Sequence, residues 1–209
     1  MKLQTLMIEE KNWNINKTQS IIGADEVGRG SLAGPIVGAA VKLKYDHIDL
    51  IKDVKDSKKL SPKKREEIFE RVNKNNVEYA ISERSNLFID NEGISVANKK
   101  VLSESIKKIY FQSDKVYVDH FKIDNFGSVS LVRGEDQSYS VALASIIAKV
   151  YRDDLMVKYS KIYPKYKFEK NKGYGTMEHR NMIKKYGSCD IHRVSFNFCL
   201  LYTSDAADE

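Results

Sequence analysis

Short apolar runs of strand length alternate along the chain with longer stretches of helical periodicity. Residues 19–24 and 36–43 are apolar runs that predict two buried strands, and a glycine-rich stretch between them predicts a β-hairpin. Similar runs predict further strands at 77–82, 115–119 and 128–132.

The helices are predicted from their start signals and from apolar positions three or four residues apart. Ser61 before Pro62 predicts a helix that runs to about residue 73. Further helices are expected over 92–110, from residue 140 onward, where the sequence is apolar nearly all round, and over 176–186. Residues 1–18 predict a leading helix or arm. The interleaved pattern indicates an α/β or α+β domain with a helical C-terminal part from about residue 155.

Composition narrows the class of protein only slightly. The chain has 209 residues with a formal net charge of +6, which suits one domain and a polyanionic partner, although solubility alone could explain the charge. Two cysteines without zinc-type spacing, no signal peptide and no membrane-spanning apolar run lead us to expect a cytoplasmic protein.

The strongest candidate chemistry follows the first predicted strand. Asp25 and Glu26 end that strand, and the turn Gly28-Arg29-Gly30 comes directly after them. Carboxylates beside a cationic glycine turn suit a divalent metal ion together with a phosphate, because glycine leaves backbone N–H groups open to a close ligand. Taken alone, however, this stretch fits a plain hairpin with surface charges equally well.

Two further acids could complete such a site. Asp119 ends the strand 115–119 and would meet Asp25 and Glu26 if the strands are neighbours, although a strand-end aspartate is also common in turns. Asp136 lies just before the apolar helix, and its spacing favours a helix-capping role over that of a fourth metal ligand.

Two other segments could contact a nucleic acid. Lys58 and Lys59 begin a run of cations that could hold backbone phosphates, although a solvated lysine-rich face is the simpler interpretation. Tyr174 lies between two glycines, where an aromatic ring could stack on a sugar or base or could merely pack the loop.

Taken in order, these motifs resemble those of bacterial ribonuclease HII over roughly residues 19–197. The segments that carry the resemblance are 23–30 with Gly34-Pro35, 56–60, 117–119, 144–153, 171–176 and 192–196. Each is modest alone, but six in the same order are highly specific. The resemblance implies an RNase H-like fold with a central mixed sheet flanked by helices.

The resemblance also implies an activity: an endoribonuclease that cleaves the RNA strand of RNA–DNA hybrids and cuts 5′ to single ribonucleotides in duplex DNA. Such an enzyme leaves 3′-hydroxyl and 5′-phosphate ends and serves in ribonucleotide and RNA primer removal. Two Mg²⁺ or Mn²⁺ ions about 4 Å apart would clamp the scissile phosphate. Carried over by position, the metal-binding and catalytic carboxylates are Asp25, Glu26, Asp119 and Asp136.

The same resemblance assigns substrate contacts. The turn Gly28-Arg29-Gly30 would read the ribose 2′-hydroxyl, and Tyr174 would pack against the neighbouring sugar. Lys58 and Lys59 are expected to contact the backbone, and the enzyme is expected to be a monomer.

Two positions depart from the family pattern. His120 replaces the small residue that usually follows the Val-Asp pair, and the ending at 198–209 is unlike that of the family, so we expect an atypical tail there. The competing hypotheses are a non-catalytic nucleic-acid-binding module, which would lose the acids, and a nucleotide binder, for which the sequence has no G-x-G-x-x-G or Gly-Lys-Ser/Thr loop in a strand–loop–helix context.

Overall fold

The computed structural model describes residues 7–51, 54 and 60–196. Lys58, Lys59 and the predicted tail at 198–209 lie outside these residues. No helix in the described part of the chain is long and apolar enough to cross a membrane.

One mixed five-stranded sheet, in the order β3-β2-β1-β4-β5, forms the centre of the fold. The antiparallel strands β1 (Ile21–Val27), β2 (Ile36–Leu43) and β3 (Glu78–Arg84) form one half, which confirms the predicted hairpin. The strands β4 (Lys115–Asp119) and β5 (Val129–Leu131) are added in parallel beside β1. The strand β1 is therefore central and has a parallel neighbour on one side only.

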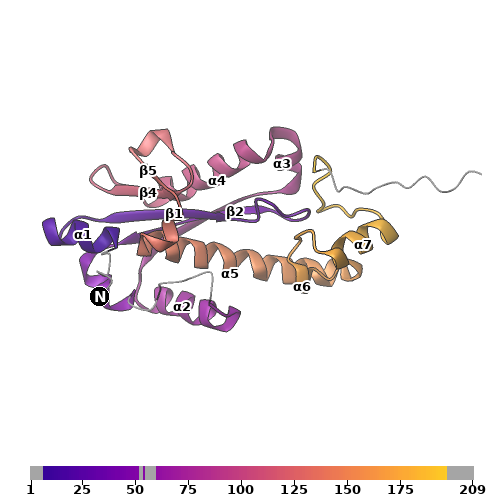
Figure 1. The fold of residues 1–209 in the computed structure, drawn as a ribbon, viewed down its shortest axis with the longest axis horizontal. Helices are drawn as coiled ribbons and strands as arrows, with labels where there is room; N and C mark the ends of the chain where they lie inside the picture. Colours follow the sequence, from indigo (N-terminus) through magenta and orange to yellow (C-terminus); the bar gives the residue numbers. More distant parts are fainter. Residues whose placement is uncertain (1–6, 52–53, 55–59, 197–209) are drawn as a thin grey trace, which may run out of the picture.

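Helices cover both faces of the sheet, so the domain has three layers (Figure 1). The helix α4 (Ile94–Ile109) covers one face, and α5 (Tyr139–Ile162) with α2 (Pro62–Lys74) covers the other. Alternate residues of β1 enter the two cores: Ile21 joins the cluster on the α5 side, and Ile22 and Ala24 join the cluster on the α4 side. This confirms the predicted α/β class with a mixed sheet and flanking helices.

The segment between β3 and α4 differs from the prediction. We expected a loop there, followed by one helix from residue 92, but the structure has a separate helix α3 (Asn86–Glu92) before α4. Ser85 caps α3 by accepting a hydrogen bond from Phe88 N, and Gly93, at φ +83°, separates the two helices. A seven-residue helix is too short to give a periodic signal.

The expected N-terminal arm contains a short helix, α1 (Ile8–Ile15), that packs onto the domain. Met7 and Trp13 belong to the core cluster between the sheet and α5. Residues 7–15 thus contribute to the same core as β1.

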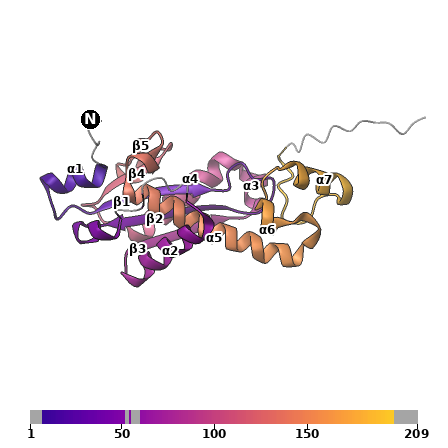
Figure 2. The same cartoon turned by 60° about the horizontal axis from the view of Figure 1, so that its bottom comes forward.

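The C-terminal part of the described chain packs beyond the end of the sheet (Figure 2). It consists of the outer half of α5, the short helix α6 (Phe168–Asn171) and α7 (Met177–Tyr186), which share their own apolar cluster. Thr176 caps α7 and Gly187 follows its last residue, as predicted. In the described part of the chain, four 3-10 turns lie in the connections: η1 (Tyr45–Leu50), η3 (Asp124–Phe126), η4 (Gly134–Asp136) and η5 (Pro164–Tyr166).

Candidate active site

The carboxylates of β1 and β4 come together because these two strands are parallel neighbours. Ala24 pairs with Val118 across the two strands, so the residues that follow, Asp25 and Asp119, lie next to each other where the pairing of β1 with β4 ends. Asp25, Glu26 and Asp119 all line one pocket of about 410 Å³. The predicted convergence of these three acids is therefore present.

The fourth acid in this pocket is Glu135. The 3-10 turn η4 (Gly134–Asp136) places Glu135 in the pocket lining, 3% exposed, and Gly134 N donates a 2.6 Å hydrogen bond to Asp119 Oδ1. The predicted fourth acid, Asp136, points elsewhere: its exposed carboxylate pairs with Arg133 Nη2 at 2.5 Å. Asp136 is not a helix cap either, because Ser138 caps α5.

The pocket holds negative charge that the surrounding protein does not fully compensate. Burial, with a smaller contribution from Asp119, raises the pKa of Asp25 to about 7, although a hydrogen bond from Ser145 opposes the shift. Burial and then the charges of Asp25 and Asp119 raise the pKa of Glu26 to about 8. At neutral pH these groups would gain from a nearby cation.

The donor set fits hard divalent cations, because the pocket offers carboxylate oxygens. Within the described residues, no three acidic, histidine or cysteine side chains are gathered closely enough to ligate a metal ion as they stand. We therefore expect at least one of the carboxylates to rotate inward when an ion binds.

The turn after β1 is shaped by two glycines with different roles. Gly28 has φ +92°, and a Cβ there would lie 2.2 Å from Arg152 Nε, so no other residue fits without displacement. A Cβ at Gly30 would meet no protein atom within 4 Å, and its φ is not positive. Gly30 therefore leaves open space at the surface, beside the exposed Arg29, whose guanidinium lies 5.0 Å from the Phe121 ring centre.

Two buried arginines hold this turn in place. The Arg152 guanidinium donates to Ala33 O, Pro35 O and Lys172 O at 2.8–3.0 Å. It thereby joins the turn to the Gly-Tyr-Gly loop. Arg193 donates twice to Gly34 O and once to Arg29 O.

Tyr174, which the resemblance assigns to a sugar contact, lies at the pocket wall. It lines the same pocket as the carboxylates, and its loop is tied to the turn because Gly173 O accepts hydrogen bonds from Leu32 N and Ala33 N. Gly173, at φ +81°, lies so close to Ala33 O that a Cβ would be 2.4 Å away. The aromatic ring and the Arg29 turn are thus fixed relative to each other.

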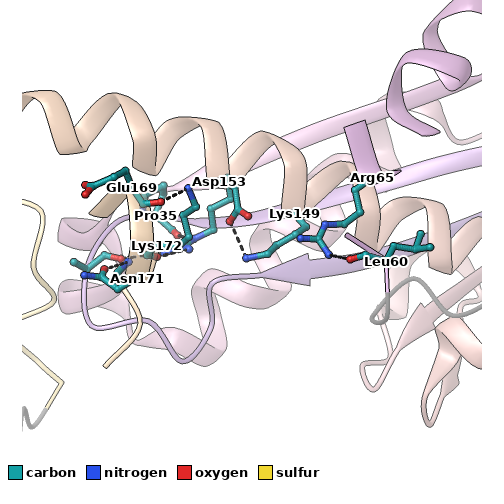
Figure 3. A network of polar contacts seen from close by, with 11 residues as sticks. Pro35, Leu60, Arg65, Lys149, Asp153, Glu169, Asn171 and Lys172 are labelled. Carbon is teal, nitrogen blue, oxygen red and sulfur yellow. Dashed lines mark hydrogen bonds and ion pairs between the residues drawn. The ribbon is translucent and has the colours of Figure 1, made fainter. Parts of the chain in front are cut away.

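Two cations also line the pocket: Arg65 from α2, which ends the run of cations that begins at Lys58, and Lys149 from α5. Lys149 Nζ pairs with Asp153 Oδ1 at 2.7 Å, and Arg65 Nη1 donates to Leu60 O at 2.7 Å (Figure 3). Both lie among ordinary helix-surface lysines and arginines in the sequence, so only the tertiary structure distinguishes them.

His192 has a structural environment. It is 1% exposed, its Nε2 lies 3.1 Å from His179 Nε2, and Cys189 N donates to its Nδ1. At His120, which departs from the family pattern, the exposed imidazole lies 3.8 Å from Asp119 Oδ2. The backbone of His120 has a positive φ of 55°.

Comparison with known proteins agrees with this geometry. The sequence matches the family described as Ribonuclease HII over residues 22–199. A ribonuclease HII of Caldicellulosiruptor bescii is 46% identical over 191 residues, which cover 90% of this chain and 91% of that protein.

Solved structures show the same fold. The ribonuclease HII of Archaeoglobus fulgidus, determined in complex with PCNA, has a TM-score of 0.73 and 26% identity, covering 85% of this chain and 95% of that one. Bst-RNase HIII, determined in complex with Mn²⁺, has a TM-score of 0.69 and 22% identity, covering 94% of this chain and 73% of that one. At this sequence identity the similarity supports the fold alone.

The fold and the carboxylate pocket place the protein among the ribonucleases H. By its family match and its relatives, the chain belongs to the ribonuclease HII family, and it is a type 2 ribonuclease H.

Proposed function

We propose that this enzyme cleaves the RNA strand of RNA–DNA hybrids and nicks duplex DNA on the 5′ side of single embedded ribonucleotides, leaving 3′-hydroxyl and 5′-phosphate ends. This would serve ribonucleotide and RNA primer removal. The observation that carries the proposal is the convergence of Asp25, Glu26, Asp119 and Glu135 on one pocket that Tyr174 also lines. A monomer that acts in the cytoplasm is part of the proposal.

The four carboxylates are proposed to hold two Mg²⁺ or Mn²⁺ ions, with Glu135 in place of Asp136. Bound divalent ions would supply a nucleophilic water at neutral pH and neutralise charge on the scissile phosphate. The Mn²⁺ in Bst-RNase HIII shows that a protein of this fold can carry such an ion.

The remaining residues are proposed to recognise the substrate. Arg29 and the open backbone at Gly30 would contact the ribose 2′-hydroxyl, which alone separates RNA from DNA at this position. Tyr174 would pack on the neighbouring sugar. Lys149 and Arg65 would attract the phosphate backbone, since both line the pocket. For Lys58 and Lys59, backbone contact stays a prediction from the sequence.

Cleavage of a labelled DNA duplex with one internal ribonucleotide, in Mg²⁺ or Mn²⁺, tests the proposal. We expect a nick 5′ to the ribonucleotide that Asp119→Asn abolishes, whereas Asp124→Asn, in the exposed turn η3, leaves it unchanged. Arg29→Ala should weaken cutting or reduce its dependence on the ribose.

If folded wild-type protein binds the duplex but makes no nick with either ion, the nuclease proposal is wrong. The non-catalytic binding module is then the better account of the basic surface.

A further inference from the structure

The helix α1 carries a buried acid that none of the proposed catalytic steps uses. Glu9 is fully buried, and it lies before residue 22, where the family match begins. A buried carboxylate is costly unless several hydrogen bonds compensate for its lost hydration. Its partners therefore indicate what this residue stabilises.

All the hydrogen bonds that Glu9 accepts come from the first residues of α5. Its Oε1 accepts from Ser138 Oγ at 2.6 Å, Ser140 N at 2.9 Å and Ser140 Oγ at 2.7 Å. Its Oε2 accepts from Tyr139 N at 3.0 Å. Ser138 in turn caps α5 by accepting from Val141 N, so Glu9 fixes the orientation of the capping hydroxyl.

A second contact ties the same two elements together. Ile8 N donates to Gln137 O at 2.9 Å, immediately before the cap. The α1 helix therefore holds the chain on both sides of Ser138.

The segment held in this way leads directly into the carboxylate pocket. Ser138 N and Gln137 N both donate to Gly134 O, which closes the turn η4 that carries Glu135. Gly134 N binds Asp119 Oδ1, so the position of η4 also sets that carboxylate. The Glu9-bound cap, Ser138, lies only three positions after Glu135.

The other side of the α5 start packs against β1. A Cβ on Gly23 would lie 2.2 Å from Val141 N and 2.5 Å from Ser140 Oγ, so β1 and α5 are in close contact two residues before Asp25. A shift of Ser140 would therefore change the packing of α5 against β1 at Gly23. Glu9 thus connects to the acids of η4 and β4 through hydrogen bonds, and to β1 through a packing contact.

We propose that Glu9 is a positioning residue for the metal-binding carboxylates, holding η4 and the start of α5 so that Glu135 and Asp119 face the pocket together. The proposal rests on the proposed metal site. It makes α1 a working part of the enzyme although the helix lies outside the matched family region.

Glu9→Gln is the informative change because it keeps the shape of the side chain. An amide oxygen at Oε1 can still accept hydrogen bonds, but the amide nitrogen would face Tyr139 N, which is also a donor. The start of α5 should then relax while α1 stays packed through Trp13. Loss of an outer residue that orients ligands typically lowers metal affinity 10–100-fold.

The test measures Mn²⁺ binding to metal-free protein by calorimetry, at a temperature where every variant is folded. Glu9→Gln should weaken Mn²⁺ binding about 10-fold, and Ser140→Ala, which removes one donor to Glu9, should weaken it in the same direction. Trp13→Phe is the matched control. It loosens α1 without removing a hydrogen bond to the start of α5, since the Trp13 indole donates to Gln19 O.

The outcomes separate this inference from the proposed function. If Trp13→Phe weakens Mn²⁺ binding as much as Glu9→Gln, or if Glu9→Gln binds within twofold of wild type, Glu9 is merely structural and the inference is wrong. Asp119→Asn shows whether the site itself exists. If Asp119→Asn weakens Mn²⁺ binding and Glu9→Gln does not, only the inference about Glu9 fails. If Asp119→Asn leaves Mn²⁺ binding unchanged, the proposed metal site is wrong as well.

Discussion

The molecule contains two regions of buried charge, and they use it in opposite ways. In the carboxylate pocket, Asp25 and Glu26 lie close to like charges, and burial raises the pKa of both. In the C-terminal part, the buried guanidiniums of Arg152 and Arg193 bind backbone carbonyls of the glycine-rich turn.

The difference separates a region that internal hydrogen bonds hold in place from one that a bound cation would stabilise. Burial lowers the pKa of both arginines, that of Arg193 to about 9, so Arg193 stays charged at neutral pH. The hydrogen bonds of the two guanidiniums fix the Arg29 turn and the Tyr174 loop. The acids gain little from the surrounding protein and would be stabilised by a bound cation. One region therefore provides a fixed substrate-reading surface, and the other keeps its charges available for chemistry.

The largest effect is expected where a buried arginine is removed. Arg152→Ala leaves three carbonyl groups without their donor and should lower the free energy of unfolding by about 3 kcal/mol in urea titrations. Arg133→Ala, at an exposed site, should change it by less than about 0.5 kcal/mol. Equal losses in the two variants would show that the carbonyl contacts do not fix the turn.

A comparable effect on activity is expected at the fourth acid. Glu135→Gln should lower the cleavage rate about 100-fold or more, because a direct ligand should matter at least as much as an outer one. Asp136→Asn, one residue away but paired with Arg133 outside the pocket, should stay within about twofold of wild type by the same reasoning. The reverse ranking in a single-turnover assay would restore Asp136 as the fourth acid.

The raised pKa of Asp25 predicts how stability depends on pH. Because its folded-state pKa of about 7 lies above the ordinary value of 3.8, its contribution is fully present below pH 4 and is lost as pH rises through 7. In EDTA, the stability advantage of Asp25→Asn over wild type should therefore grow by about 2 kcal/mol between pH 5 and 7. If the stability advantage of Asp25→Asn is constant with pH, the pKa of Asp25 is not raised in the metal-free enzyme.

The histidines of the C-terminal part should show the opposite slope, with a smaller size. Burial and the neighbouring His179 lower the pKa of His192 from 6.5 to about 4, so its contribution is fully present above pH 6.5 and is lost as pH falls toward 4. Relative to wild type, His192→Asn should reduce the loss of stability between pH 6.5 and 5.5 by about 1 kcal/mol in urea titrations. If the loss of stability at low pH is unchanged in His192→Asn, His179 and His192 do not form a neutral buried pair.

The sequence predicted the elements that have long or repeated signals. Asp25 and Asp119 were predictable because each directly follows a short apolar run, and parallel neighbouring strands bring such positions together. The hairpin, the Ser61 and Thr176 caps and the long helix α5 were also predictable from local chemistry.

What the sequence could not supply depends on three-dimensional placement. Asp136 and Glu135 are adjacent acids in a polar loop without periodicity, and only the turn η4 decides which one faces the pocket. The Gly-Glu pair ahead of the Ser138 cap is the one local signal that could have favoured Glu135. Glu9 lies among polar residues of a short helix, where nothing marks it as buried.

The most direct test of the central claim is a crystal structure of the wild-type enzyme with Mn²⁺, with anomalous scattering used to locate the ion. We expect Mn²⁺ in direct contact with Asp25, Asp119 and Glu135, and Asp136 still paired with Arg133. Mn²⁺ bound away from the Asp25–Asp119 edge of the sheet, or coordinated by Asp136 in place of Glu135, would contradict this account of the site.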